Sequence, residues 1–181
     1  MNWQKLRSRV VYDNPFMTVL EDRVINPSGG QNDYGYIHFK TTAVAIVPLD
    51  EYNNTWLVGQ DRYTLGQYSW ELPMGGATTD ESRLDAAKRE LKEETGLSAV
   101  HWRKLMHLHT SNSITDEEAR VYLATGLQKG EPDFEETENI EIRRLPLTKA
   151  VAMATNGTIT DAISVAALLW MQQERFKQPK P

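Results

Sequence analysis

The sequence predicts an α/β protein in which helices cover both faces of a mixed β-sheet, an α/β/α sandwich preceded by an antiparallel β extension. Strand-like and helix-like segments interleave along residues 41–181, an order typical of sheets covered by helices. Residues 43–49 are all apolar, which predicts a strand buried on both faces. Residues 16–40 contain two β-rich segments and no helix pattern. We therefore divide the chain into an N-terminal extension, residues 1–40, and a main domain, residues 41–181.

The extension is predicted to contain an antiparallel pair of strands. Residues 17–24 and 34–40 are rich in β-branched and aromatic side chains, and residues 26–30, Asn-Pro-Ser-Gly-Gly, have the composition of a turn. An isolated hairpin is marginally stable in water. It must therefore lie on the main domain or on a second copy of the chain, and we expect a homodimer.

The main domain contains further candidate strands and three candidate helices. The strands are expected at residues 55–62, 69–72, 101–110, 120–127 and 140–145. The helices are expected at residues 80–95, at residues 148–155 with Thr148 as the cap, and after Asp161, which can cap the last one.

The composition excludes several classes of partner. Twenty basic and 25 acidic residues give a net charge of −5, and no Lys/Arg-rich run could follow a phosphate backbone, so we expect no nucleic-acid partner. No apolar stretch has the length of a signal peptide or a membrane span, so no membrane partner is expected. The chain has no cysteine, which suits a reducing cytoplasm and excludes thiolate metal sites.

A glycine-containing loop and an acidic helix carry the candidate chemistry. Residues 73–76, Pro-Met-Gly-Gly, predict a tight turn whose backbone can approach a ligand. In the following helix Glu90, Glu93 and Glu94 have i, i+3 and i+4 spacing, so their carboxylates share a face. Gly96 stands where a left-handed C-cap is expected.

The clustered glutamates suggest a site for a hard divalent cation. Like charges at i and i+4 cost an isolated helix roughly 0.2–0.5 kcal/mol, and Mg²⁺, which bridges carboxylates to substrate phosphates, would offset that cost. Taken alone, however, these three residues also fit an ordinary solvated helix face.

The full spacing favours a cation site over a solvated helix face, because the segment resembles the Nudix box. That motif is a Gly, five residues, a Glu, seven residues, and then Arg-Glu-aliphatic-any-Glu-Glu-any-Gly-aliphatic. All its fixed positions match this chain, at Gly75, Glu81, Arg89, Glu90, Leu91, Glu93, Glu94, Gly96 and Leu97. The resemblance implies the Nudix fold and a metal-dependent hydrolase that cuts a diphosphate linkage in a nucleotide.

The resemblance also implies roles for individual residues. Glu90 and Glu94 resemble the principal metal ligands, Glu93 a further ligand or catalytic support, and Met74 a ligand through its backbone carbonyl. The expected cofactor is Mg²⁺, with Mn²⁺ as an alternative. Glu81 and Arg89 resemble residues that orient the helix.

Outside the box the chain is similar to ADP-ribose and nucleoside diphosphate sugar pyrophosphatases. In the segments Gln-Asp-Arg-Tyr at 60–63 and Trp-Glu-Leu-Pro at 70–73, the resemblance places Arg62 and Glu71 as substrate-binding residues, Arg62 on a phosphate. Arg62 is equally compatible with a surface arginine at a strand end, and Glu71 with a residue that ends a strand. An N-terminal aromatic side chain could stack on the base, and the sequence does not select one.

The base that activates water in that subgroup lies in an acidic loop after the box. Glu136 is the first candidate and Glu138 the second, while a solvated acidic loop is the structural alternative. Asn112 stands where ADP-ribose hydrolases often have a proline, which leaves other sugar nucleotides such as GDP-mannose open. The remaining alternatives are hydrolysis of a dinucleoside polyphosphate or nucleoside triphosphate, and a non-catalytic nucleotide-binding module.

Overall fold

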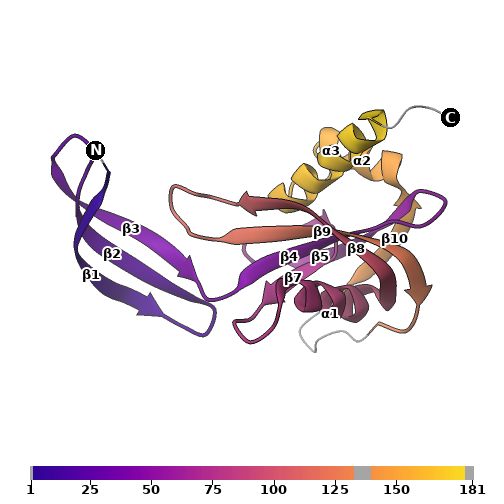
Figure 1. The fold of residues 1–181 in the computed structure, drawn as a ribbon, viewed down its shortest axis with the longest axis horizontal. Coiled ribbons are helices and arrows are strands. Elements are labelled where there is room, and N and C mark those ends of the chain that lie inside the picture. Colours follow the sequence, from indigo (N-terminus) through magenta and orange to yellow (C-terminus); the bar gives the residue numbers. More distant parts are fainter. Residues whose placement is uncertain (1, 133–139, 178–181) are drawn as a thin grey trace.

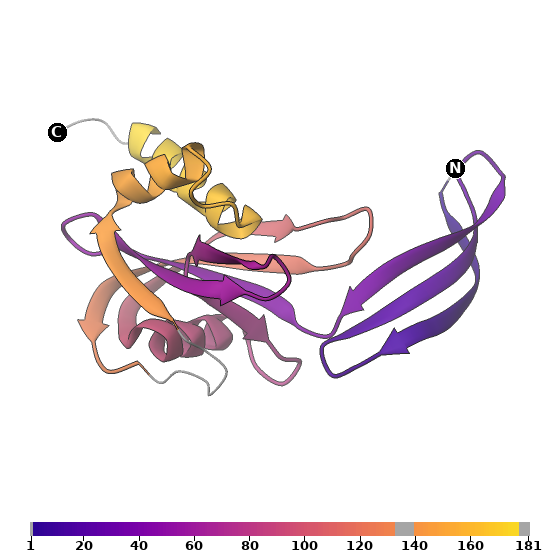
Figure 2. The same cartoon turned by 180° about the vertical axis from the view of Figure 1, so that it is seen from behind.

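The N-terminal sheet and a larger body are the two parts of the molecule (Figure 1). The computed structural model describes residues 2–132 and 140–177. Figure 2, the view from behind, shows the N-terminal sheet extending away from the body. The body contains both remaining sheets and all three helices of the described residues.

Three antiparallel strands form the N-terminal sheet in the order β1-β2-β3. They are β1 (Gln4–Asp13), β2 (Met17–Ile25) and β3 (Gln31–Phe39). The predicted turn between β2 and β3 is confirmed: the Asn26 side-chain oxygen accepts hydrogen bonds from the backbone N–H groups of Ser28 and Gly30, each at 3.0 Å. Gly29 between them has φ +87°, a conformation that glycine adopts without steric cost.

Strand β1 was not predicted from the sequence. All ten of its residues are exposed, so it shows no alternation between a buried and a solvated face, the signal by which a half-buried strand is recognised. Basic residues at Lys5, Arg7 and Arg9 are typical of an edge strand.

A four-stranded mixed sheet lies at the centre of the body, in the order β7-β4-β9-β8. Its strands are β4 (Thr42–Pro48), β7 (Met74–Ala77), β8 (Leu97–His109) and β9 (Glu118–Lys129). Strand β4 pairs in parallel with β9 and antiparallel with β7. Residues 44–47 of β4 have no exposed surface, so the predicted burial on both faces is confirmed.

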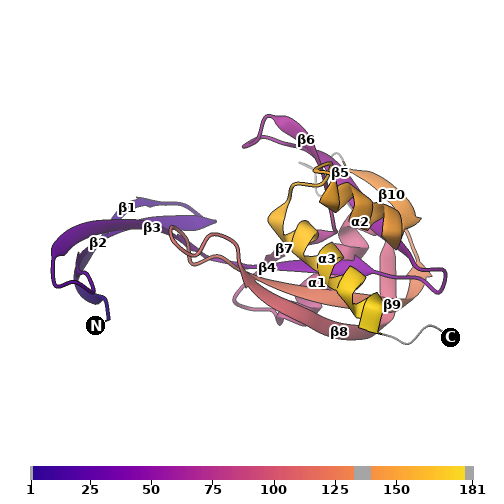
Figure 3. The ribbon, with the colours of Figure 1, turned by 90° about the horizontal axis from the view of Figure 1, so that it is seen from above.

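The second sheet of the body is antiparallel, in the order β10-β5-β6. Its strands are β5 (Asn54–Arg62), β6 (Gln67–Glu71) and β10 (Glu141–Pro146). Seen from above, the β5–β6 hairpin projects from the body (Figure 3). The hairpin carries Arg62, the last residue of β5, and Glu71, the last residue of β6, toward the candidate site described below.

Helices cover opposite sides of these sheets, as predicted. They are α1 (Arg83–Thr95), α2 (Leu147–Thr155) and α3 (Ala162–Lys177). Leu91 of α1 packs in a cluster with Val44 and Ile46 of β4, whereas Leu168 of α3 packs with Val47 of the same strand. In the part of the chain that the structure describes, no helix is long and apolar enough to cross a membrane.

Two of the three predicted helix caps are confirmed, one of them Gly96, which has φ +70° and donates its N–H to the Lys92 carbonyl at the end of α1. Asp161 accepts a hydrogen bond from the Ser164 N–H at 2.7 Å, so it caps α3 as predicted. Helix α1 is capped by Ser82, which accepts from the Asp85 N–H, and therefore begins later than the predicted Asp80. Thr148 does not cap α2, because that helix begins at Leu147 after Pro146.

Candidate active site

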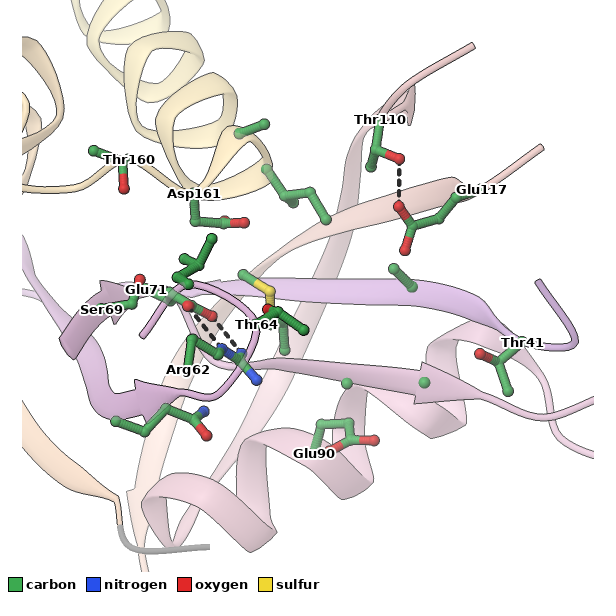
Figure 4. Close-up of a pocket in the computed structure, with 18 of the residues that line it drawn as sticks. Thr41, Arg62, Thr64, Ser69, Glu71, Glu90, Thr110, Glu117, Thr160 and Asp161 are labelled. Atoms are coloured by element: carbon green, nitrogen blue, oxygen red, sulfur yellow. Dashed lines mark hydrogen bonds and ion pairs between the residues drawn. The ribbon is translucent and has the colours of Figure 1, made fainter. Parts of the chain in front are cut away.

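A cavity of about 880 Å³ opens between the two sheets of the body and the junction with the N-terminal sheet. Strands β5, β6 and β7 and helix α1 line one part of it, and the start of α3 contributes Asp161. Phe16, Phe39 and residues around the turn between β8 and β9 line another part. In Figure 4, Arg62 and Glu71 lie at one end of the cavity and Thr110 and Glu117 at the other. The cavity therefore brings the predicted box residues together with groups from distant segments.

The glycines of the box form a strand, which corrects the predicted tight turn at residues 73–76. Gly75 and Gly76 in β7 pair with Val44 and Ala43 of β4. Their lack of a side chain has a packing reason: a Cβ on Gly75 would lie 2.1 Å from the carboxyl carbon of Glu90. Gly75 thus lets the Glu90 carboxylate lie directly against the strand backbone.

Glu90 and Glu94 of α1 both line the cavity. The Glu94 residue is 3% exposed, and its carboxylate accepts a hydrogen bond from the Met74 N–H at 2.9 Å. The Glu90 side chain is 13% exposed and accepts from Arg89 at 2.8 Å. Two carboxylates are thereby held at the wall of one cavity.

These two carboxylates fit a hard divalent cation. Mg²⁺ takes oxygen ligands and is commonly held by one or two carboxylates together with substrate phosphates and water. The cradle at Gly75 favours such a role, because it leaves room for a carboxylate where any other residue would place a side chain. Among residues 2–132 and 140–177, no three His, Cys, Asp or Glu side chains form a group that could hold a metal ion.

Arg89 joins the acidic residues of the box. Its guanidinium donates to Glu81, Glu90 and Glu93, each at 2.8 Å, and to the Gly76 carbonyl at 3.0 Å. The hydrogen bond with Glu81 raises the pKa of Arg89, while the same bond lowers the pKa of the Glu81 carboxyl. Arg89 therefore ties α1 to β7, and the Glu93 carboxylate is bonded to Arg89.

Arg62 and Glu71 form a two-point ion pair within the cavity wall. Arg62 Nε donates to Glu71 Oε1 at 2.9 Å, and Nη2 donates to Oε2 at 2.5 Å. Glu71 is 4% exposed, whereas the Arg62 side chain is 37% exposed. The hydrogen bond with Glu71 raises the pKa of Arg62. The two residues predicted to bind substrate are thus in contact, with the guanidinium the more accessible.

Several cavity residues were not predicted from the sequence. Thr110 and Glu117 meet across the neck of a loop, where the Thr110 hydroxyl donates to the Glu117 carboxylate. Neither belongs to a motif, so only the paired course of β8 and β9 brings them together. Phe16 and Phe39 are the N-terminal aromatic residues at the cavity. The candidate bases Glu136 and Glu138 lie outside the described residues.

Family comparisons agree with this fold. The NUDIX domain model matches residues 39–168, and the nucleoside diphosphate sugar hydrolase N-terminal domain model matches residues 3–37. The chain therefore belongs to the Nudix hydrolase family. The resemblance inferred from the box is confirmed.

Individual relatives cover most of the chain. It is 34% identical over 187 residues to the ADP-ribose pyrophosphatase of Mycobacterium tuberculosis, which covers 99% of this chain and 89% of that protein. It is 29% identical over 169 residues to the CMP-5'-(N-acetyl-N-hydroxy-3-aminopropyl)phosphonate hydrolase of Streptomyces rubellomurinus, which covers 93% of this chain and 82% of that protein. A crystal structure of an ADP compounds hydrolase has the same fold, with a TM-score of 0.86, 23% identity, and coverage of 96% of this chain and 94% of that chain.

Proposed function

We propose that this protein hydrolyses the diphosphate linkage of a nucleoside diphosphate sugar, releasing a nucleoside monophosphate and a sugar phosphate. The observation that carries the proposal is the pair of carboxylates, Glu90 and Glu94, beside Arg62 in one cavity. A diphosphate presents negative charge that a divalent cation and a guanidinium can neutralise together. The match to the nucleoside diphosphate sugar hydrolase N-terminal domain supports this substrate class.

Each candidate residue has a distinct task in this proposal. Glu90 and Glu94 hold the divalent cation, for which we favour Mg²⁺ over Mn²⁺, with the Met74 carbonyl as a further oxygen donor. When bound, such a cation neutralises diphosphate charge and lowers the pKa of bound water. Arg62 orients a phosphate, and Glu93, bonded to Arg89, supports the metal-binding face of the helix.

The base that accepts the proton of the attacking water is assigned to the acidic loop. Glu136 is our first candidate and Glu138 our second. Both are carboxylates, which serve as general bases when they lie within hydrogen-bond reach of the water. Glu71 acts with Arg62, whose guanidinium it holds at two points.

The chemistry of the cavity favours a substrate with hydroxyl groups on both sides of the diphosphate. Thr110 and Glu117 line one end, Ser69 and Asp161 the other, and all four can hydrogen-bond to a sugar. The M. tuberculosis relative named an ADP-ribose pyrophosphatase makes ADP-ribose the first candidate. GDP-mannose is the second, because Asn112 replaces the proline often present in ADP-ribose hydrolases.

The protein is also proposed to act as a homodimer through its N-terminal sheet. Exposed apolar side chains of the first strand and the residues next to it gather there: Trp3, Leu6, Val10, Val11, Tyr12 and Phe16. Apolar surface of this kind is unfavourable in water and is typical of a contact with another protein surface. A second copy of the chain presents the same surface, so that pairing of two copies would bury these apolar side chains.

A substrate panel tests the proposed activity. With Mg²⁺ present, ADP-ribose, GDP-mannose, UDP-glucose and a dinucleoside polyphosphate are each incubated with the enzyme, and phosphatase-releasable phosphate is measured. We expect a nucleotide sugar, ADP-ribose first, to be the best substrate. Rapid cleavage of the dinucleoside polyphosphate alone would overturn the substrate class, and binding without any turnover would indicate a non-catalytic module.

A further inference from the structure

The loop between β8 and β9, residues 110–117, connects the N-terminal sheet to the cavity. On its outer side it bonds to β3: the Ile37 N–H donates to the Ile114 carbonyl at 2.9 Å, and the Asp116 N–H donates to the Ile37 carbonyl at 3.2 Å. The Tyr34 hydroxyl adds a bond to the Ser113 carbonyl at 2.6 Å. The loop thus follows β3 for several residues.

The Asp116 carboxylate binds the last two residues of β3, where the contact between the loop and β3 ends. Its Oδ1 accepts a hydrogen bond from the Phe39 N–H at 3.0 Å, and its Oδ2 lies 2.5 Å from His38 Nδ1. The two oxygens therefore engage two consecutive residues at the end of β3. The Asp116 side chain is 47% exposed, so these bonds exist at a surface and not in the core.

Two residues next to Asp116, Phe39 and Glu117, line the cavity. Phe39 lines one wall, and its N–H donates a hydrogen bond to Asp116. Glu117, the next residue in the chain, lines another, and it is held to Thr110 at the neck of the loop. Asp116 itself stands behind them, because it is absent from the residues that line this cavity and borders a smaller one beside it.

We propose that Asp116 is a positioning residue that fixes Phe39 relative to Glu117 and so sets the affinity for the organic group bound between them. The inference rests on the proposed function and adds a residue that lies outside the Nudix box. Phe39 offers an aromatic face and Glu117 a hydrogen-bond acceptor, which together suit a nucleoside or sugar moiety. In Figure 4, Glu117 lies at the opposite end of the cavity from Arg62 and Glu71.

This separation predicts a particular kinetic signature. Loss of the Asp116 bonds would loosen the binding of the organic group while the diphosphate end keeps its contacts. We therefore expect KM to rise and kcat to change little, as for an interaction made equally in the ground and transition states. A purely structural role would lower stability without changing KM.

The test compares three full-length variants. Asp116→Ala is expected to raise KM for ADP-ribose about tenfold, which corresponds to roughly 1.4 kcal/mol, with kcat within about twofold. Asp116→Asn keeps an acceptor for the Phe39 N–H and should recover most of the loss. Asp33→Ala is the matched control, because Asp33 also lies on β3, pairs with Arg23 at 3.2 Å and has a side chain that is 51% exposed.

Calorimetric titration with ADP-ribose in EDTA separates this inference from the proposed function. If wild-type protein binds ADP-ribose and Asp116→Ala binds it about tenfold more weakly, the positioning role holds even if no nucleotide sugar is cleaved. Equal binding or equal KM in wild type and Asp116→Ala would overturn it. A parallel fall in kcat, or the same KM change in Asp33→Ala, would also overturn it.

Discussion

The carboxylate of Glu94 accepts a hydrogen bond from the backbone N–H of Met74 at 2.9 Å. This bond joins helix α1 directly to the first residue of β7. It keeps a nearly buried carboxylate at the cavity wall in spite of the cost of desolvating a charge. The acidic helix and the glycine strand therefore act as one unit.

Replacement of Glu94 by glutamine tests the proposed metal site. The amide oxygen can still accept from Met74, so the fold should persist, but the negative charge is lost. We expect kcat to fall by about 10²–10³-fold, as when a group that stabilises transition-state charge is removed. Circular dichroism checks the fold, and Glu174→Gln, a surface partner of Arg103, is the control; wild-type kcat in Glu94→Gln would contradict the assignment.

A methyl group at Gly75 tests the close approach of Glu90. The added Cβ would lie 2.1 Å from the Glu90 carboxyl carbon, so Gly75→Ala must displace the carboxylate. Activity at saturating Mg²⁺ should fall at least tenfold, or about 1.4 kcal/mol. Gly76→Ala should do less harm, because its Cβ would meet Thr41 Oγ1 at 3.3 Å. Equal activity in the two variants would contradict this account.

The pair formed by Glu81 and Arg89 predicts how stability depends on pH. The hydrogen bond from Arg89 holds the pKa of Glu81 below its ordinary value of 4.5. The stabilisation is therefore complete above about pH 4.5 and is lost as the pH falls through the lowered folded-state value. Glu81→Gln should be about 1 kcal/mol less stable than wild type at neutral pH, since the pair is partly exposed.

Urea unfolding at several pH values measures that difference. The gap between wild type and Glu81→Gln should narrow as the pH is lowered below about 4.5, because protonated Glu81 no longer carries the charge that Arg89 binds. A gap that stays constant with pH would mean that the loss arises from packing and not from the ion pair.

The exposed apolar side chains of β1 predict a dimer in solution. Light scattering should give a mass of twice the 20.7 kDa of one chain. Val10→Glu, which places a charge on this surface, should shift the mass toward one chain. Val100→Glu is a matched control, since Val10 and Val100 are both 60% exposed but Val100 lies on β8 of the body. A monomeric wild type would contradict the proposed assembly.

The sequence predicted the box helix well because spacing alone determines which residues share a helix face. Glu90 and Glu94 reach the cavity as expected. Glu93 shows the limit of that reasoning, because its bond to Arg89 depends on how the side chain turns. Glycines 75 and 76 were expected to form a turn, since nothing in the local sequence shows that β4 pairs with them.

Other parts of the site depend on tertiary structure. Glu117 and Phe39 are brought to one cavity by the contact between β3 and a loop that follows much later in the chain. No local pattern reports such a contact. Strand β1 was missed for a related reason: its residues are all exposed, so the burial that shapes an alternating sequence is absent in the single chain.

The parallel pairing of β4 with β9 also has a consequence for biosynthesis. A nascent chain that ends at the last residue of the box would contain β4 and β7 but not β9, and would leave a long apolar strand open on one side. Pairing between segments so distant in sequence is slow to form. Helix α1 is therefore expected to acquire its final position late, after β9 has left the ribosome.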